Sequence, residues 1–84
     1  MTQQALQAAH PLDNVVVAVD DILAGTAITV TLDGRDITLT VLDDVPFGCM
    51  VAIRDIPRGR PVVRGGARVG VATRSVRAGQ RVDI

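Results

Sequence analysis

Two runs of alternating apolar and polar residues flank the dipeptide Asp33-Gly34. Residues Thr26–Leu32 alternate before it, and residues Ile37–Val41 alternate after it. Successive side chains of a strand point to opposite faces, and Asp-Gly accepts the positive φ angles of a tight turn. The pattern therefore predicts a β-hairpin with one buried apolar face and one solvent-exposed face, which we call the wet face. The wet face is expected to carry Thr29, Thr31, Thr38 and Thr40.

The other apolar segments of the chain are short, and glycine or proline separates most of them. They are Val15–Val19, Val51–Ile53, Val62–Val63, Val69–Ala72 and Val82–Ile84. No segment keeps a helical period of 3.6 residues for long enough to form a sizeable helix. Short strands with frequent turns are typical of barrel-like or clip-like all-β folds. With 84 residues, the chain is expected to form one domain.

A five-residue pattern recurs four times along the chain. The copies are Asp21-Ile22-x-x-Gly25, Asp44-Val45-x-x-Gly48, Asp55-Ile56-x-x-Gly59 and Ser75-Val76-x-x-Gly79. We interpret each copy as a corner in which Asp or Ser bonds the local backbone and the apolar residue anchors the turn. Glycine then adopts a left-handed φ at little cost. The glycines are 23, 11 and 20 residues apart, so the pattern is a reused corner and not a solenoid repeat.

Composition limits the chemistry and the location of the protein. Phe47 is the only aromatic residue, so the core must consist of Val, Ile, Leu and Ala. Cys49 is the only cysteine, which excludes an intramolecular disulfide and a Cys-x-x-Cys metal site. Residues 1–9 lack the features of a signal peptide and are expected to form a flexible tail before a domain at 10–84. No apolar stretch is long enough to span a membrane, so we expect a cytoplasmic protein.

Charge is divided unevenly between the two parts of the chain. Residues 1–53 contain one Arg and seven Asp (1 − 7 = −6), whereas residues 54–84 contain eight Arg and two Asp (8 − 2 = +6). One interpretation is that the two parts fold together and neutralise each other. The other is that the arginine-rich side binds an anionic ligand or an acidic partner. The arginines lack interleaved aromatic residues, so we expect no nucleic-acid binding.

Few residues could carry chemistry. His10, the only histidine, could bind a metal or transfer protons, or it could be an exposed loop residue. Cys49 could be a nucleophile or a ligand, or a small, partly buried apolar residue. Gly65-Gly66 does not open a helix, which excludes a phosphate-binding loop of the dinucleotide or P-loop kind. A hydrolase acting alone is not expected, because Cys49 with His10 is the only conceivable nucleophile–base pair.

The ordered succession of several segments resembles the N-terminal SAF domain of the altronate/galactarate dehydratase family. The segments are His10–Ala18, Asp21–Gly25, Val45–Gly48, Ala52–Gly59, Val62–Thr73 and Val76–Val82. The resemblance covers about residues 10–84 and implies a small β-clip fold. Where this chain has Gly48-Cys49-Met50, the family usually has Gly-His-Lys, and its Lys-Tyr-Gly corresponds to Arg64-Gly65-Gly66 here.

The resemblance also implies a function. In the family, this domain precedes a large catalytic domain that removes water from a sugar acid or related hydroxy acid with a divalent metal, often iron. In the similar sulfolactate dehydratases, the small domain can be a separate polypeptide. The chain is thus expected to be a small dehydratase subunit that helps to bind a sugar-acid or sulfonated hydroxy-acid substrate, while a large subunit supplies catalysis and Fe or Mn.

The same resemblance suggests site residues at matching positions. His10 would face the metal region, and Arg64, with Arg54, would pair with the substrate carboxylate. Asp13 and Asn14 are further candidates for substrate binding.

An alternative function is a non-enzymatic SAF-type module for binding or assembly, as in proteins of pilus and flagellar assembly. Such a module could self-associate into a homo-oligomer, because an exposed hairpin edge invites pairing. A neighbouring reading frame for a large dehydratase subunit would favour the enzymatic alternative.

Overall fold

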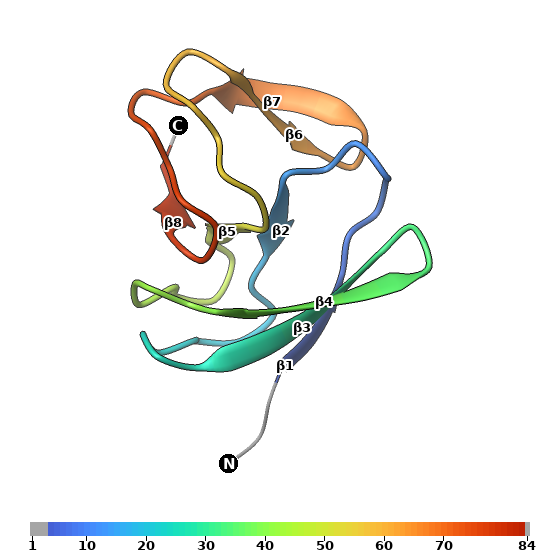
Figure 1. Cartoon of the computed structure of the whole chain (residues 1–84). Helices are drawn as coiled ribbons and strands as arrows, with labels where there is room; N and C mark the ends of the chain where they lie inside the picture. Colours follow the sequence, from blue (N-terminus) through green and yellow to red (C-terminus); the bar gives the residue numbers. More distant parts are fainter. Residues whose placement is uncertain (1–3, 84) are drawn as a thin grey trace.

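Short strands and turns make up residues 4–83, the part of the chain that the computed structural model describes (Figure 1). The strands are β1 (Gln4–Gln7), β2 (Val15–Val17), β3 (Ala27–Leu32), β4 (Arg35–Thr40), β5 (Met50–Ala52), β6 (Pro61–Arg64), β7 (Ala67–Val71) and β8 (Arg81–Val82). They form sheets in the orders β1-β3-β4, β2-β5-β8 and β6-β7. The all-β prediction is confirmed. Within residues 4–83, no helix is long and apolar enough to cross a membrane.

The hairpin expected around Asp33-Gly34 is present as β3 and β4. The strands pair in antiparallel register from Ala27 opposite Thr40 to Leu32 opposite Arg35. Asp33 has a φ of 52° and Gly34 a φ of 77°, the two positive angles that a tight hairpin turn with the right-handed twist of its strands requires. Ile28, Val30 and Leu32 of β3 are buried and the threonines of β4 are exposed, so the predicted division into two faces is confirmed.

Residues near the N-terminus form a strand where we expected a flexible tail. Gln4–Gln7 are β1, which pairs in parallel with β3. Leu6 and Ala8 are buried in the core beside that strand. The physical reason is an alternation in which Leu6 and Ala8 point inward while Ala5 and Gln7 point outward. Residues 1–3, the rest of the expected tail, lie outside the described residues.

The sheet β2-β5-β8 lies between two apolar cores. Val15 pairs with Ala52, and both face one core, whereas Val16 pairs with Val51 and both face the other. A strand buried on both faces needs apolar residues at every position, which explains the uninterrupted valines. The expectation of a buried strand over Val15–Val19 was too long, because β2 ends at Val17 and Val19 is exposed.

The four corners associate in two pairs. Ile22 and Val45 exchange backbone hydrogen bonds of 2.9 and 2.8 Å, and Ile56 and Val76 exchange bonds of 2.7 and 2.8 Å. We call the Asp or Ser that begins each corner its cap. The side chain of each cap accepts a hydrogen bond from a backbone N–H of the partner corner, and that N–H lies three residues after the partner's cap. Asp44 accepts from the N–H of Ala24, Asp21 from Phe47, Asp55 from Ala78 and Ser75 from Arg58, at 2.9, 2.8, 2.9 and 3.4 Å.

This crossed capping corrects the sequence-based interpretation, in which each Asp or Ser bonds its own turn. The pairing also shows that the chain contains two structural repeats. Each repeat consists of a strand, a corner, a hairpin and a second corner, in that order. In the first repeat the N–H of Gly25 donates to Val41, and in the second the N–H of Gly59 donates to Ala72. The first hairpin is β3–β4 and the second is β6–β7.

Candidate functional site

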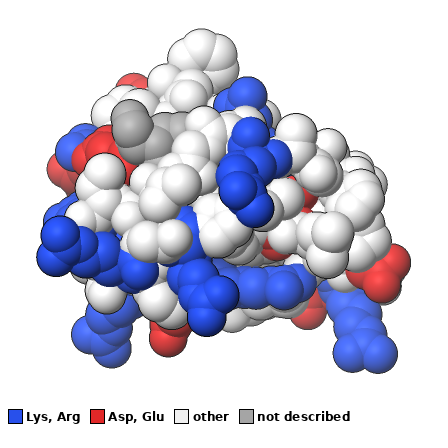
Figure 2. All heavy atoms as spheres, turned by 90° about the horizontal axis from the view of Figure 1, so that it is seen from above, with Lys and Arg blue, Asp and Glu red and all other residues white. Residues whose placement is uncertain are grey.

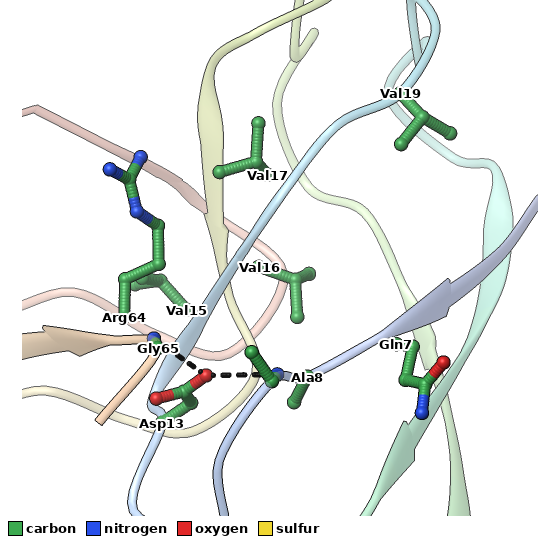
Figure 3. Close-up of a pocket in the computed structure, with 10 residues that line it drawn as sticks. Gln7, Ala8, Asp13, Val15, Val16, Val17, Val19, Arg64 and Gly65 are labelled. Carbon is green, nitrogen blue, oxygen red and sulfur yellow. Dashed lines mark hydrogen bonds between the residues drawn. The ribbon is translucent and has the colours of Figure 1, made fainter. Parts of the chain in front are cut away.

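The side chain of Asp13 is buried beneath the loops that carry its neighbours. It is only 1% exposed. One carboxylate oxygen, Oδ2, accepts hydrogen bonds from the N–H groups of Ala9, His10 and Gly65 at 3.1, 3.2 and 2.9 Å. The other oxygen accepts from Gly66 at 2.8 Å. Asp13 therefore holds the segment before β2 against the turn between β6 and β7, and Figure 3 shows its bond to Gly65.

The pKa of Asp13 reflects these contacts. Burial alone would raise it, but the four backbone donors, led by Gly66 and Gly65, outweigh burial and lower the pKa below the ordinary value of 3.8. The carboxylate is thus ionised near neutral pH and its oxygens are engaged by the main chain. This arrangement suits a fixed clamp better than a group that exchanges protons.

His10 packs against the same turn. A Cβ atom on Gly66 would lie 2.8 and 2.9 Å from two carbon atoms of the His10 ring, so only glycine allows this approach. The Nδ1 atom of His10 accepts a hydrogen bond of 3.1 Å from the N–H of Leu12. A neutral imidazole with an accepting Nδ1 carries its proton on Nε2. The exposed ring therefore offers an N–H donor to a ligand.

Asn14 connects the same segment to the start of the second hairpin. Its side-chain oxygen accepts from the N–H of Val63 at 2.8 Å, and its amide nitrogen donates to the carbonyl of Pro61 at 2.9 Å. Its backbone N–H also donates to Val63 at 3.1 Å. The polar atoms of Asn14, like those of Asp13, contact main chain, so both residues fix the position of β6 and its turn.

A groove of about 390 Å³ runs beside this junction. Its lining consists of Gln7, Ala8, Ala9, Asp13, Val15, Val16, Val17, Val19, Arg64 and Gly65. In Figure 3 the Arg64 guanidinium and Val19 lie toward opposite ends, with the valines of β2 between them. The groove therefore combines one cation with an apolar floor. Such a surface suits a small molecule that has an anionic group and a short carbon chain.

Arg54 does not line this groove. It lies in a second hollow of about 350 Å³ together with Arg35, and its guanidinium donates to the carbonyl of Pro11 at 3.3 Å. The two arginines that we expected to act on one carboxylate thus line different hollows.

The structure offers no complete metal site on the described part of the chain. No cluster of three His, Cys, Asp or Glu side chains is found among residues 4–83. His10 already uses Nδ1, and binding a metal through Nε2 would need the proton to move and the bond to Leu12 to break. Cys49 is half-buried against the first core and lines neither groove. These residues do not fit a metal centre held by this chain alone.

Sequence reasoning missed the role of Gly65-Gly66. The sequence was used only to argue against a phosphate loop there, whereas the pair forms the turn that Asp13 and His10 contact. The available signal was a Gly-Gly dipeptide between two β-branched segments, which predicts a hairpin turn. The valine floor of the groove could not be recognised, because nothing local distinguishes it from core.

Arginine side chains gather on the face above β6 and β7 (Figure 2). Arg81 pairs with Asp83 at 3.5 Å, within the same part of the chain. Asp13, Asp21 and Asp44 of the first part accept hydrogen bonds from backbone N–H groups. Both interpretations of the uneven charge stay predictions.

Comparison with known proteins identifies a matching family. The model of the altronate/galactarate dehydratase SAF domain matches residues 4–84. Altronate dehydratase of Escherichia coli strain K12 is 38% identical over 73 residues, which are 87% of this chain and 14% of that protein. Galactarate dehydratase (L-threo-forming) of the same strain is 34% identical over 76 residues, 88% of this chain and 13% of that protein.

A third relative is similar in length to this chain. The alpha subunit of (2R)-sulfolactate sulfo-lyase of Chromohalobacter salexigens is 32% identical over 79 residues. The match covers 89% of this chain and 84% of that subunit. The chain therefore spans about one seventh of the two dehydratases but most of the sulfo-lyase subunit.

Proposed function

The chain belongs to the altronate/galactarate dehydratase SAF domain family, and from this premise we propose that it is the small subunit of a hydroxy-acid dehydratase or related lyase. It binds the substrate, while a larger partner chain supplies the catalytic base and any metal. The observation that carries the proposal is the groove with Arg64 at one end, beside a turn that Asp13 clamps.

The need for a partner is supported by the lengths of the relatives. The dehydratases extend far beyond the match, which covers 14% and 13% of them. The sulfo-lyase relative is itself named a subunit, and the match covers 84% of it. A chain with one histidine and no cluster of metal ligands among its described residues also needs groups from elsewhere for an elimination reaction.

Arg64 is proposed to bind the substrate carboxylate. A guanidinium can donate two parallel hydrogen bonds to a carboxylate, which fixes both its position and its orientation. The carbon chain of a sugar acid or sulfonated hydroxy acid then lies along Val17, which is partly exposed in the groove. His10 packs against the same turn but does not line the groove, and its Nε2–H is proposed to donate to a substrate oxygen. Arg54 in the neighbouring hollow stays a predicted second contact.

The proposed chemistry follows from these positions. In the elimination, the partner's base takes the proton from the carbon next to the carboxylate. The neighbouring carbon of a sugar acid loses its hydroxyl, which takes up a proton from an acid of the partner and leaves as water. From a sulfonated hydroxy acid the group that leaves this carbon is sulfite. Negative charge develops toward the carboxylate, where Arg64 stabilises it in the transition state. Asp13 and Asn14 act on this step through the main chain, because they fix the turn that follows Arg64.

The first test is to purify the tagged chain from its own cells and to identify what accompanies it by mass spectrometry. We expect a large dehydratase-like chain in fixed ratio. The complex, but not the small chain alone, should act on altronate, galactarate or (2R)-sulfolactate with Fe(II) or Mn(II). A homo-oligomer without other chains, or an unrelated partner, would contradict the proposal and favour a binding or assembly module.

Variants of the active complex then test the site. We expect Arg64→Ala to lower kcat/KM about 100-fold, because a charge-assisted, two-pronged contact to the substrate is lost. His10→Ala should lower it less, by about 10-fold, because a single hydrogen bond is lost. Arg35→Ala is the matched arginine control from the other hollow. Equal losses for the two arginine variants would contradict the assignment of the carboxylate to Arg64.

A further inference from the structure

One corner pair carries large apolar side chains that its counterpart does not. Val19, Leu23 and Phe47 surround the pair formed by the first and second corners, and we call these three residues the apolar corner. They are 64%, 69% and 71% exposed. Backbone contacts bring their segments together, because the N–H of Phe47 donates to Asp21 and the N–H of Gly48 donates to Ala18.

The second corner pair serves as an internal control. At the positions equivalent to Leu23 and Phe47 it has Pro57 and Ala78, and Arg58 and Arg77 lie beside them. Both pairs form the same bridge and crossed caps. The corner can therefore be built without large apolar side chains. Exposed Leu and Phe side chains that the fold does not require are typical of a protein–protein interface.

Charge restricts what can cover the apolar corner. The exposed acids Asp20, Asp21 and Asp44 border it. A second copy of the chain on the same face would bring acidic groups against acidic groups, which is unfavourable. A covering surface must instead have an apolar centre with Lys or Arg at its rim.

The position of the apolar corner relates it to the substrate groove. Val19 also lines that groove, toward the end away from Arg64 (Figure 3). A chain seated on the apolar corner would lie at the end of the groove away from Arg64, where it could place its own groups next to a substrate held by Arg64.

We propose that Val19, Leu23 and Phe47 are the docking surface for the large catalytic chain, which contributes an apolar pocket rimmed by basic side chains. The inference rests on the proposed function and adds the surface and the chemistry of its partner. Phe47 is expected to contribute most to affinity, because a large aromatic side chain that becomes buried in an interface often dominates its binding energy.

The test uses the large chain recovered in the co-purification, separated from the small chain and titrated by calorimetry. We expect Leu23→Ser/Phe47→Ser to weaken binding at least about 30-fold, because the central apolar contacts are lost. The control is Arg58→Ser/Arg77→Ser, which changes the two residues beside the equivalent positions in the second corner pair and should alter the dissociation constant by less than about threefold. Because both pairs of residues are exposed, all variants should keep the melting temperature of the native chain.

The outcomes separate this inference from the proposed function. If a complex forms and the apolar double variant binds as tightly as the native chain, the docking surface is wrong while the small-subunit proposal stands. If the control weakens binding more than the apolar variant does, the partner covers the basic corner pair instead. If the native chain self-associates in sedimentation and Phe47→Ser makes it monomeric, a second copy covers the surface and the inference is overturned.

Discussion

The two hairpins occupy equivalent places in the two repeats but differ in what surrounds them. The first, β3–β4, has a regular register, a two-residue turn and β1 along one edge. The second, β6–β7, has an irregular register between Val62 and Val63, and the segment before β2 contacts its turn and β6. The part of the chain that contains the second hairpin is rich in arginine, whereas Arg35 is the only arginine of the first part.

The comparison separates what the fold requires from what it does not. Both repeats need paired corners, a glycine after each corner and a bridge between apolar residues. Only the second hairpin needs a buried carboxylate to hold its turn, and only that turn lies beside the groove. Similar backbones with different side chains thus distinguish a structural hairpin from one that is adapted to a site.

The largest expected difference in stability is between substitutions of the glycines that end the first and the fourth corner. Gly25 and Gly79 have φ angles of 90° and 94°. A Cβ at Gly25 would meet nothing, whereas at Gly79 it would collide with the carbonyl oxygen of Thr40. Gly25→Ala should cost about 1–2 kcal/mol for its positive φ, and Gly79→Ala about 1–3 kcal/mol more for the forced backbone shift. Urea denaturation measures both, and equal losses would contradict close packing of the repeats at Gly79.

The next effect concerns the clamp that only the second hairpin has. Asp13→Asn should lower the free energy of unfolding by about 2 kcal/mol near neutral pH, because the amide group cannot accept all four backbone donors. The native chain has a lowered Asp13 pKa, so its stabilisation is complete above the ordinary value of 3.8 and is lost as the pH falls through the folded-state pKa.

Denaturation curves at several pH values test this prediction. The difference between the native chain and Asp13→Asn should be constant above about pH 5 and should shrink at lower pH. Amide exchange at Gly65 and Gly66 should accelerate in the variant, while exchange at Gly34 in the first hairpin serves as the control. A difference that does not change with pH would argue against an ionised Asp13.

The smallest effect is expected from a substitution that gives both corner pairs the same caps. Ser75 is the only cap without a charge, and its bond to the N–H of Arg58 is the longest, at 3.4 Å. Ser75→Asp should stabilise the chain by about 1 kcal/mol, because a carboxylate accepts more strongly than a hydroxyl. The reverse change in the first pair, Asp44→Ser, should destabilise it by a similar amount. Melting curves of both variants test this prediction, and changes that are not opposite in sign would contradict it.

Local pattern determined a large part of this protein. The alternation around Asp33-Gly34 predicted the hairpin, because strand periodicity and positive φ angles are properties of neighbouring residues. The recurring corners, the all-β class and the family were also visible in the sequence. His10, Asp13, Asn14 and Arg64 were all singled out, although their contacts were not.

Tertiary structure decided how these pieces combine. Each corner cap bonds another corner, and Asp13 bonds glycines more than fifty residues away, so no local rule could assign these partners. Residues 4–7, which we expected in a flexible tail, form a strand because Leu6 is buried beside Val30. The separation of Arg54 from Arg64 likewise depends on where two distant segments pack, because side-chain proximity across a fold is set by the whole chain and not by spacing along it.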